Sequence, residues 1–223
     1  MMGDEREFDL RSFGRRRGRK PSERQARLLR DVLPRVAVDL AEPVPATAQD
    51  VWLEIGFGGG EHLVWQARHA PDVTIIGCEP FEDGVVKVLT AIEDDALANV
   101  RIHMDDARDL LRALPEASIA RAFILFPDPW PKRKHIKRRL VNAAALALLA
   151  RVLRPGGELR IATDIGDYAR TMLEAFRDET RFVWQADAPS DWRVRPADWP
   201  ETRYEAKAAR EGRGSYYFRF RRV

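Results

Sequence analysis

Residues 51–60 have the sequence Val-Trp-Leu-Glu-Ile-Gly-Phe-Gly-Gly-Gly, and this stretch decides the fold. The apolar run at residues 51–55 has the length of a buried strand, and the glycines that follow favour a sharp turn into a helix over residues 60–69. The glycine spacing is G-x-G-x-G, and Glu61 comes next, so the dinucleotide-binding fingerprint G-x-G-x-x-G is not met. The stretch therefore predicts a strand–turn–helix unit that brings its backbone close to some other ligand.

Strand-like and helix-like patterns alternate along the rest of the chain. Further apolar strands are predicted over residues 73–78, 100–104, 120–126 and 158–163, and the helices between and after them over 81–95, 107–113, 139–152 and 165–176. The remaining predictions are a turn at 154–157, an extended loop at 187–214 and final strands at 182–186 and 216–221. Repeated β–α units with near-continuous apolar strands predict an α/β fold, in which helices cover both faces of a mostly parallel sheet.

The N-terminal residues differ in composition from the rest. Residues 1–21 are polar and rich in arginine, without apolar periodicity. We expect them to form a disordered basic arm, and residues 22–223 to form one domain. Ser22 is a suitable helix N-cap, apolar residues follow it at helical spacing, and Pro34 is expected to end or kink that helix.

The composition excludes several classes of protein. Cys78 is the only cysteine, which excludes an intramolecular disulfide and a zinc cluster of cysteines. No apolar stretch approaches the ~18 residues of a membrane span, and the N-terminus lacks the apolar core of a signal peptide. We therefore expect a cytoplasmic protein with no bound metal and no membrane partner; the sequence implies no particular oligomeric state.

Carboxylates are predicted around the glycine turn, at the ends of successive strands. Glu54 lies within the first strand, Glu79 ends the second and Asp106 follows the third. Ligands of such sheets bind outside the carboxyl ends of the strands, where Glu79 can accept the hydroxyls of a ribose. With the backbone of Gly56 and Gly58 close by, an acidic set fits a positively charged nucleoside such as S-adenosylmethionine. The alternative is a tight turn with carboxylates that only cap helices.

A second informative stretch, Ile-Leu-Phe-Pro-Asp-Pro-Trp-Pro at residues 124–131, runs directly into Lys-Arg-Lys-His-Ile-Lys-Arg-Arg at 132–139. A strand delivers Asp128 into a loop stiffened by prolines, with the planar ring of Trp130 two residues later. The basic residues at 132–139 suggest that a planar ligand ring bound beside Asp128 and Trp130 belongs to a nucleic acid, because phosphate attraction dominates affinity for such partners. The alternatives are a solvated charge run, and a Trp130 that packs beneath the loop rather than stacking on a base. The predicted phosphate contacts in this basic run are Lys134, Lys137, Arg138 and Arg139.

The net charge of +3 hides an uneven distribution. Residues 1–39 carry 11 Lys/Arg against 7 Asp/Glu, residues 40–131 carry 6 against 16, and residues 132–223 carry 21 against 12. An acidic middle between basic ends indicates two surfaces for two partners, a cationic or hydroxyl-rich small ligand and a polyanion.

Taken together, these segments resemble the bacterial tRNA (guanine-N7-)-methyltransferase family over about residues 50–221. The motifs that carry the resemblance are residues 53–60, Phe-Pro-Asp-Pro-Trp-Pro-Lys at 126–132, Lys-Arg-Arg at 137–139, Ala-Thr-Asp at 162–164 and Thr-Arg-Tyr-Glu at 202–205. Many methyltransferases share the first motif. The second and the last, in this order and spacing, are specific to the family.

The resemblance implies a Rossmann-like methyltransferase fold, S-adenosylmethionine as the methyl donor, and N7 of a guanine in the variable loop of tRNA as the acceptor. The cofactor-site residues that it implies are Glu54, Glu79, Asp106 and Asp128, and Asp128 is also the implied catalytic position. The substrate-binding positions that it implies are Lys132, Asp164, Thr202, Arg203, Tyr204 and Glu205. Two segments depart from the family pattern: Pro80-Phe81-Glu82 after Glu79 is unusual, and the Arg-rich residues 11–20 lie outside the shared core.

Two other functions compete with this interpretation. Asp128-Pro129-Trp130 resembles the Asp/Asn-Pro-Pro-aromatic motif of amino-group methyltransferases that act on adenine or cytosine, although Trp130 stands where that motif has its second proline. A non-catalytic RNA-binding subunit would also carry a basic run, but an intact acidic cofactor set argues against it.

Overall fold

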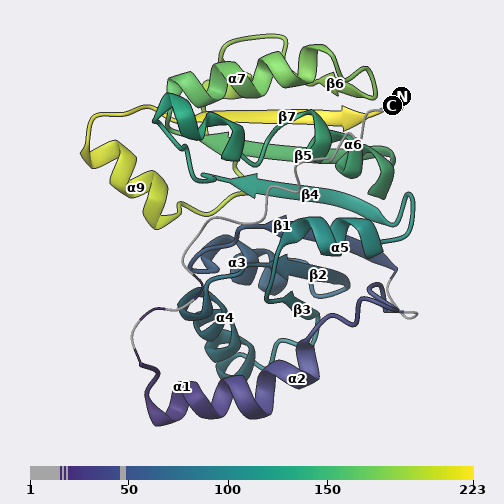
Figure 1. Ribbon diagram of the computed structural model, residues 1–223, viewed down its shortest axis with the longest axis vertical. Helices are drawn as coiled ribbons and strands as arrows, with labels where there is room; N and C mark the ends of the chain where they lie inside the picture. The colour runs from purple at the N-terminus through teal and green to yellow at the C-terminus, as the bar shows by residue number, and fades with distance from the viewer. Residues whose placement is uncertain (1–15, 17, 19, 46–48) are drawn as a thin grey trace, which may run out of the picture.

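The computed structural model describes residues 16, 18, 20–45 and 49–223 of the chain, and Figure 1 shows their arrangement. The seven strands of one sheet are β1 (Asp50–Ile55), β2 (Val73–Cys78), β3 (Val100–His103), β4 (Ile119–Leu125), β5 (Leu153–Thr163), β6 (Phe182–Trp184) and β7 (Tyr216–Arg222). Their order is β3-β2-β1-β4-β5-β7-β6; β1 to β5 are parallel, and β7 is antiparallel to both of its neighbours. The predicted α/β fold with a mostly parallel sheet is confirmed.

Helices cover both faces of the sheet because successive strand residues point to opposite faces. Leu53 and Ile55 of β1 belong to a core cluster with α5 (Ala107–Ala113), α6 (Ala143–Val152) and α7 (Gly166–Arg177). Trp52, the residue before Leu53, packs on the opposite face, against a cluster that contains residues of α3 (Glu61–His69) and α4 (Glu82–Asp94). The helices α8 (Ser190–Arg193) and α9 (Arg203–Arg210) lie between β6 and β7 in the chain.

The N-terminal helix begins as predicted and is divided into three parts. Ser22 accepts from the Gln25 amide, and the Gln25 side chain accepts from the Ser22 amide, which completes a capping box. The helix runs through α1 (Glu23–Arg27), a π-helical turn η1 (Leu28–Val32) and α2 (Leu33–Val36). The π-helical turn ends at Val32, just before the turn that contains Pro34, and proline lacks the amide hydrogen that a regular helix uses, so the irregularity is at the predicted kink. In Figure 1, α1 and α2 lie at the β3 end of the sheet, and α7 lies at the opposite end.

Three local predictions were wrong. The helix predicted over 139–152 begins at Ala143, after the N-cap Asn142, and a 3₁₀ helix η2 (Arg133–Arg138) holds part of the basic run. The predicted turn at 154–157 is a bulge inside β5, because Ile119 pairs with Leu153 and Arg121 already pairs with Glu158. The predicted loop at 187–214 contains α8 and α9.

The prediction of disorder for residues 1–21 lies mostly outside the described residues. Of that segment, Arg16 lies beside the start of α4 and the loop after β3: its carbonyl accepts from the Glu82 amide at 3.1 Å, and its guanidinium donates to Asp105 at 2.8 Å. Among the helices that the structure describes, none is both long and apolar enough to cross a membrane.

Candidate active site

The glycine turn between β1 and α3 leaves open space beside its backbone. Gly56 has a φ of 75°, which favours glycine, and no heavy atom lies within 4 Å of the position that a Cβ would occupy there. The amide of Gly58 donates to Oε2 of Glu79 at 2.8 Å, and the amide of Phe81 donates to Oε1 at 3.0 Å. Glu79 therefore ties the end of β2 to the glycine turn, beside open space that a ligand can fill.

Glu54 is buried in β1 and is held by two polar residues of α3. Oε2 of Glu54 lies 2.7 Å from Nδ1 of His62, and Nε2 of His62 lies 3.0 Å from the side-chain nitrogen Nε2 of Gln66. That nitrogen also donates to the Asp198 carbonyl, so His62 accepts at Nε2 and donates from Nδ1 to Glu54. The sequence analysis did not identify His62 as a site residue; its signal is a histidine in the first turn of the helix that follows the glycines.

Three predicted acidic residues act on one another beside the glycine turn. Burial raises the pKa of Glu79 above its ordinary value of 4.5, while the hydrogen bonds from Gly58 and Phe81 lower it. The negative charges of Asp128 and Glu54 add to the increase in pKa. Because like charges that are close together disfavour ionisation, a cationic ligand in the open space would relieve this repulsion.

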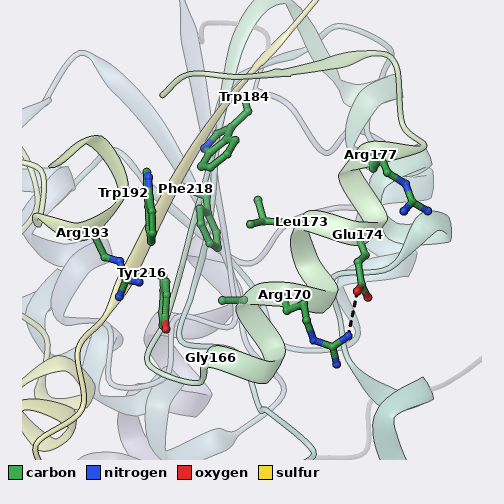
Figure 2. Close-up of a pocket in the computed structure, with 11 residues that line it drawn as sticks. Gly166, Arg170, Leu173, Glu174, Arg177, Trp184, Trp192, Arg193, Tyr216 and Phe218 are labelled. Carbon is green, nitrogen blue, oxygen red and sulfur yellow. Dashed lines mark hydrogen bonds and ion pairs between the residues drawn. The ribbon is translucent and has the colours of Figure 1, made fainter. Parts of the chain in front are cut away.

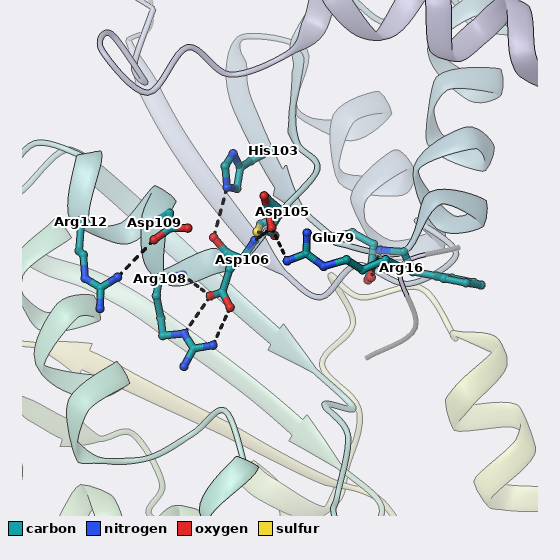
Figure 3. A network of polar contacts seen from close by, with 10 residues as sticks. Arg16, Glu79, His103, Asp105, Asp106, Arg108, Asp109 and Arg112 are labelled. Atoms are coloured by element: carbon teal, nitrogen blue, oxygen red, sulfur yellow. Dashed lines mark hydrogen bonds and ion pairs between the residues drawn. The ribbon is translucent and has the colours of Figure 1, made fainter. Parts of the chain in front are cut away.

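The fourth predicted acid, Asp106, is already bound to protein groups (Figure 3). Its carboxylate caps α5 by accepting from the Arg108 amide at 2.9 Å, and it forms an ion pair with the Arg108 guanidinium. The neighbouring Asp105 is more exposed, and it binds Arg16. Asp106 therefore keeps its predicted place at the end of β3, but Asp105 presents the more accessible carboxylate of the two.

Backbone strain marks both ends of the Pro-Asp-Pro-Trp loop after β4. Phe126 has a φ of 50° and Trp130 a φ of 41°, and both are bulky residues in the left-handed region. Asp128 lies between them and is exposed. Trp130 packs on η2, with its ring 5.8 Å from that of His135 and 5.1 Å from the Arg138 guanidinium. The loop thus places Asp128 beyond the end of β4, near enough to Glu79 for its charge to raise the pKa of that carboxyl.

Arg139 was predicted to contact a phosphate of the nucleic acid, but it is buried and bound to protein groups. Its side chain is only 3% exposed, and it donates to the Pro129 carbonyl at 2.8 Å, to the Thr171 hydroxyl at 2.8 Å and to Asp167 at 2.6 Å. These partners lie within the protein, so the guanidinium is directed away from any external phosphate. Arg139 instead fastens the Asp128 loop to α7. The other predicted contacts, Lys134, Lys137 and Arg138, lie on η2 or at its start, where Lys134 and Lys137 are exposed.

The C-terminal motif at residues 202–205 lies beside the glycine turn, although it is about 140 residues away in sequence. A Cβ on Gly58 would lie 3.2 Å from the Tyr204 ring, and Arg203 forms an ion pair with Glu61 at 3.3 Å. In Figure 1, α9 lies on the side of the sheet at which β4 ends. The structure therefore brings this motif next to the glycine turn, and its role in substrate binding stays a prediction.

Three predicted substrate-binding residues have protein partners. Thr202 is buried and caps α9 by accepting from the Glu205 amide at 3.3 Å. Glu205 forms an ion pair with Arg195 at 3.0 Å and accepts from the Tyr217 hydroxyl. Asp164 follows β5 and pairs with Arg213 at 2.7 Å. Lys132, by contrast, is exposed at the start of η2. Among the residues that the structure describes, no group of three or more His, Cys, Asp or Glu side chains is placed to hold a metal ion.

Several solved structures similar to this one are named as methyltransferases. The 16S rRNA methyltransferase KamB has a TM-score of 0.57 and 17% identity, and the match covers 80% of this chain and 90% of that one. A 16S rRNA (adenine-N(1))-methyltransferase from Catenulisporales acidiphilia, solved with its cosubstrate, has a TM-score of 0.52 and 18% identity, with coverage of 80% and 88%. At this identity the likeness concerns the fold, and it confirms the Rossmann-like methyltransferase architecture.

Sequence comparisons identify the family. A family model described as "Putative methyltransferase" matches residues 48–218. The tRNA (guanine-N(7)-)-methyltransferase of a Ruegeria species is 47% identical over 94% of this chain and 87% of its own length. The enzyme of the same name from Hyphomonas neptunium is 49% identical, over 89% of this chain and 93% of its own. On this match and these relatives, the chain belongs to the tRNA (guanine-N(7)-)-methyltransferase family.

Proposed function

We propose that this protein transfers a methyl group from S-adenosylmethionine to N7 of a guanine in the variable loop of tRNA. The observation that carries the proposal is the arrangement of Glu54, Glu79 and Asp128 around the open space at the glycine turn. The loop that holds Asp128 continues directly into the basic run at residues 132–138. A site for a cationic nucleoside therefore adjoins a surface for a polyanion.

The residues around the glycine turn fit S-adenosylmethionine, which carries a ribose, an ammonium and a sulfonium group. Glu79 accepts hydrogen bonds from two backbone amides and still has lone pairs to accept hydrogen bonds from ribose hydroxyls. We assign the ammonium group to Glu54, which His62 orients, and the adenine edge to Asp105 or Asp106. When bound, S-adenosylmethionine supplies an electrophilic methyl group.

Close packing at Gly84 predicts a sensitive position. A Cβ on Gly84 of α4 would lie 2.1 Å from the carbonyl oxygen of Gly58, so Gly84→Ala must displace the glycine turn. We expect the free energy of unfolding to fall by about 1–3 kcal/mol, the usual cost of overpacking. The dissociation constant for S-adenosylmethionine should rise about tenfold. Titration calorimetry and thermal unfolding measure the two effects.

Gly214→Ala is the matched control, because a Cβ at Gly214 meets no atom within 4 Å. If Gly84→Ala bound the cofactor as well as Gly214→Ala does, the glycine turn would not be the cofactor site.

The acceptor atom determines what the protein must do. Guanine N7 has a lone pair and no proton, so no general base is needed and positioning dominates the rate. The ring gains positive charge as it is alkylated, and we assign to the carboxylate of Asp128 the role of offsetting that charge and of accepting hydrogen bonds from guanine N–H groups. Arg139, which binds the Pro129 carbonyl and Asp167, keeps the Asp128 loop in position against α7.

The exposed lysines of η2 predict a salt-dependent contact with tRNA. We expect the double variant Lys134→Ala, Lys137→Ala to bind tRNA more weakly at low salt. The slope of log K against log salt should become shallower by about 0.7–0.9 for each lost phosphate contact. The affinity for S-adenosylmethionine should not change.

Lys87→Ala, a change at an exposed lysine of α4 outside the basic run, is the control for this experiment. An unchanged salt slope in the double variant would mean that the basic run is only a solvated surface.

The test of the proposed activity is the identity of the modified nucleoside. After incubation of the purified protein with unmodified tRNA and labelled S-adenosylmethionine, the digested RNA should contain labelled 7-methylguanosine. Labelled N6-methyladenosine or a methylcytidine would contradict the proposal and favour the amino-group alternative.

A further inference from the structure

A second pocket, apart from the glycine turn, has a volume of about 460 Å³ and is lined by residues of α7, α8, β6 and β7. Aromatic rings form one side of it, as Figure 2 shows, and residues of α7 form the other. The aromatic residues are Trp184, Trp192, Tyr216 and Phe218. The residues of α7 include Gly166, Arg170, Leu173, Glu174 and Arg177. The function proposed above makes no use of this pocket.

The aromatic side is ordered by contacts among its own rings. Trp192 and Tyr216 are nearly parallel, with an interplanar angle of 6° and centroids 6.1 Å apart. The Arg193 guanidinium lies 4.2 Å from the centroid of Trp192 and 4.5 Å from that of Tyr216. Trp184 meets Phe218 edge to face and is 39% exposed. Rigid, partly exposed rings of this kind are suited to stacking on another planar ring.

The charges at the pocket favour a ligand that carries a phosphate. Arg170 and Arg177 have carboxylate partners: Arg170 pairs with both Asp167 and Glu174, and Arg177 pairs with Asp178. Arg193 has no carboxylate partner among the described residues, so its charge is held only against aromatic rings. A guanidinium beside stacked rings matches a nucleotide, with its planar base and its anionic phosphate.

The pocket adjoins the region where tRNA is proposed to bind. Tyr216 pairs with Thr163, the residue before Asp164, and a Cβ on Gly166 would lie 3.2 Å from the Tyr216 hydroxyl. Asp164 in turn pairs with Arg213 of the segment that leads into β7. The pocket therefore begins at the same end of the sheet as the predicted substrate-binding residues.

We propose that this pocket binds a second, unpaired base of the tRNA, outside the site of the methylated guanine. This inference rests on the proposed function, since it assumes a tRNA substrate. A base held here by stacking on Trp184, with its phosphate near Arg193, fixes the RNA at a second point and limits its rotation at Asp128. Stacking accepts any base, so the pocket adds affinity and orientation with little sequence preference.

The test is the effect of Trp184→Ala in the full chain, measured with an unmodified tRNA transcript at two salt concentrations. We expect the dissociation constant for tRNA to rise about tenfold, the usual scale for the loss of one base–aromatic stack. The slope of log K against log salt should stay unchanged, because no phosphate contact is removed. Trp184→Phe, which keeps a ring, should restore most of the affinity. Cofactor affinity should be the same in all variants.

Val183→Ala is the matched control, since Val183 is a neighbouring exposed residue of the same short strand. If the wild-type protein methylates tRNA and Trp184→Ala binds it normally, the inference is overturned while the proposed function stands. If the wild-type protein does not methylate tRNA, the proposed function itself fails. A Trp184→Ala protein that binds tRNA normally but changes its sedimentation from dimer to monomer would assign the pocket to a second copy of the chain and overturn the inference.

Discussion

Asp128→Asn should lower the rate of single-turnover methyl transfer by roughly 100-fold or more, the scale of losing one preorganised electrostatic contact. The substitution keeps the shape of the side chain and removes its charge. The strained loop between Phe126 and Trp130 and its attachment through Arg139 should survive, because neither depends on that charge. The rate must be measured with both ligands saturating, since Asp128 also lies close to Glu79 in the proposed cofactor site.

Two controls separate charge stabilisation from other roles of Asp128. The affinity for tRNA should change little, because phosphates supply most of it. The saturated wild-type complex should show a flat rate from about pH 7 to 9, because N7 has no proton to lose. A near wild-type rate in the Asn variant would exclude a catalytic charge at this position, and a rate that climbs tenfold per pH unit would indicate proton removal.

Glu79→Gln should weaken S-adenosylmethionine binding by about 1–3 kcal/mol, the cost of losing charge-assisted hydrogen bonds to a ribose. Glutamine retains one acceptor oxygen, so the bond from Gly58 or that from Phe81 can persist, and the variant should remain folded. Titration calorimetry at pH 7.5 measures the loss. An unchanged affinity would remove Glu79 from the cofactor site.

The raised pKa of Glu79 makes both the stability of the protein and its affinity for the cofactor depend on pH. Burial favours the protonated carboxyl in the free protein, so the contribution of Glu79 to stability is greatest below its ordinary pKa of 4.5 and is lost as the pH rises through the raised value. A cationic ligand favours the ionised carboxylate, so cofactor affinity should weaken as the pH falls toward that raised pKa. The Gln variant should lack both effects, and melting temperatures with and without ligand measure them.

The order of strands and helices could be predicted from the sequence because apolar runs and turn residues are local signals. Residues 73–78 are apolar enough to be recognised as a strand in isolation, and β2 has the same bounds. The bulge at 154–157 could not be predicted in this way, because it depends on the register that β4 imposes on β5. Likewise α9 begins at the Thr202 cap, inside a segment whose prolines and arginines suggested a loop.

The acidic part of the site was predictable because residues at the ends of parallel strands must meet at one edge of the sheet. The partners of those residues were not predictable from spacing. His62 binds Glu54 across the start of α3, and Arg108 occupies the carboxylate of Asp106. Arg139 looked like its basic neighbours in the sequence, yet it is buried against Asp167 of a helix 28 residues away. Such pairings are set by tertiary packing.

The most direct test of the central claim is to locate the methylated nucleotide in a defined tRNA. After reaction with S-adenosylmethionine, chain cleavage induced specifically at 7-methylguanosine should give one break, at a guanine in the variable loop, and Asp128→Asn should give almost none in the same time. A break at a guanine elsewhere in the tRNA, or methyl incorporation without any break, would contradict the account.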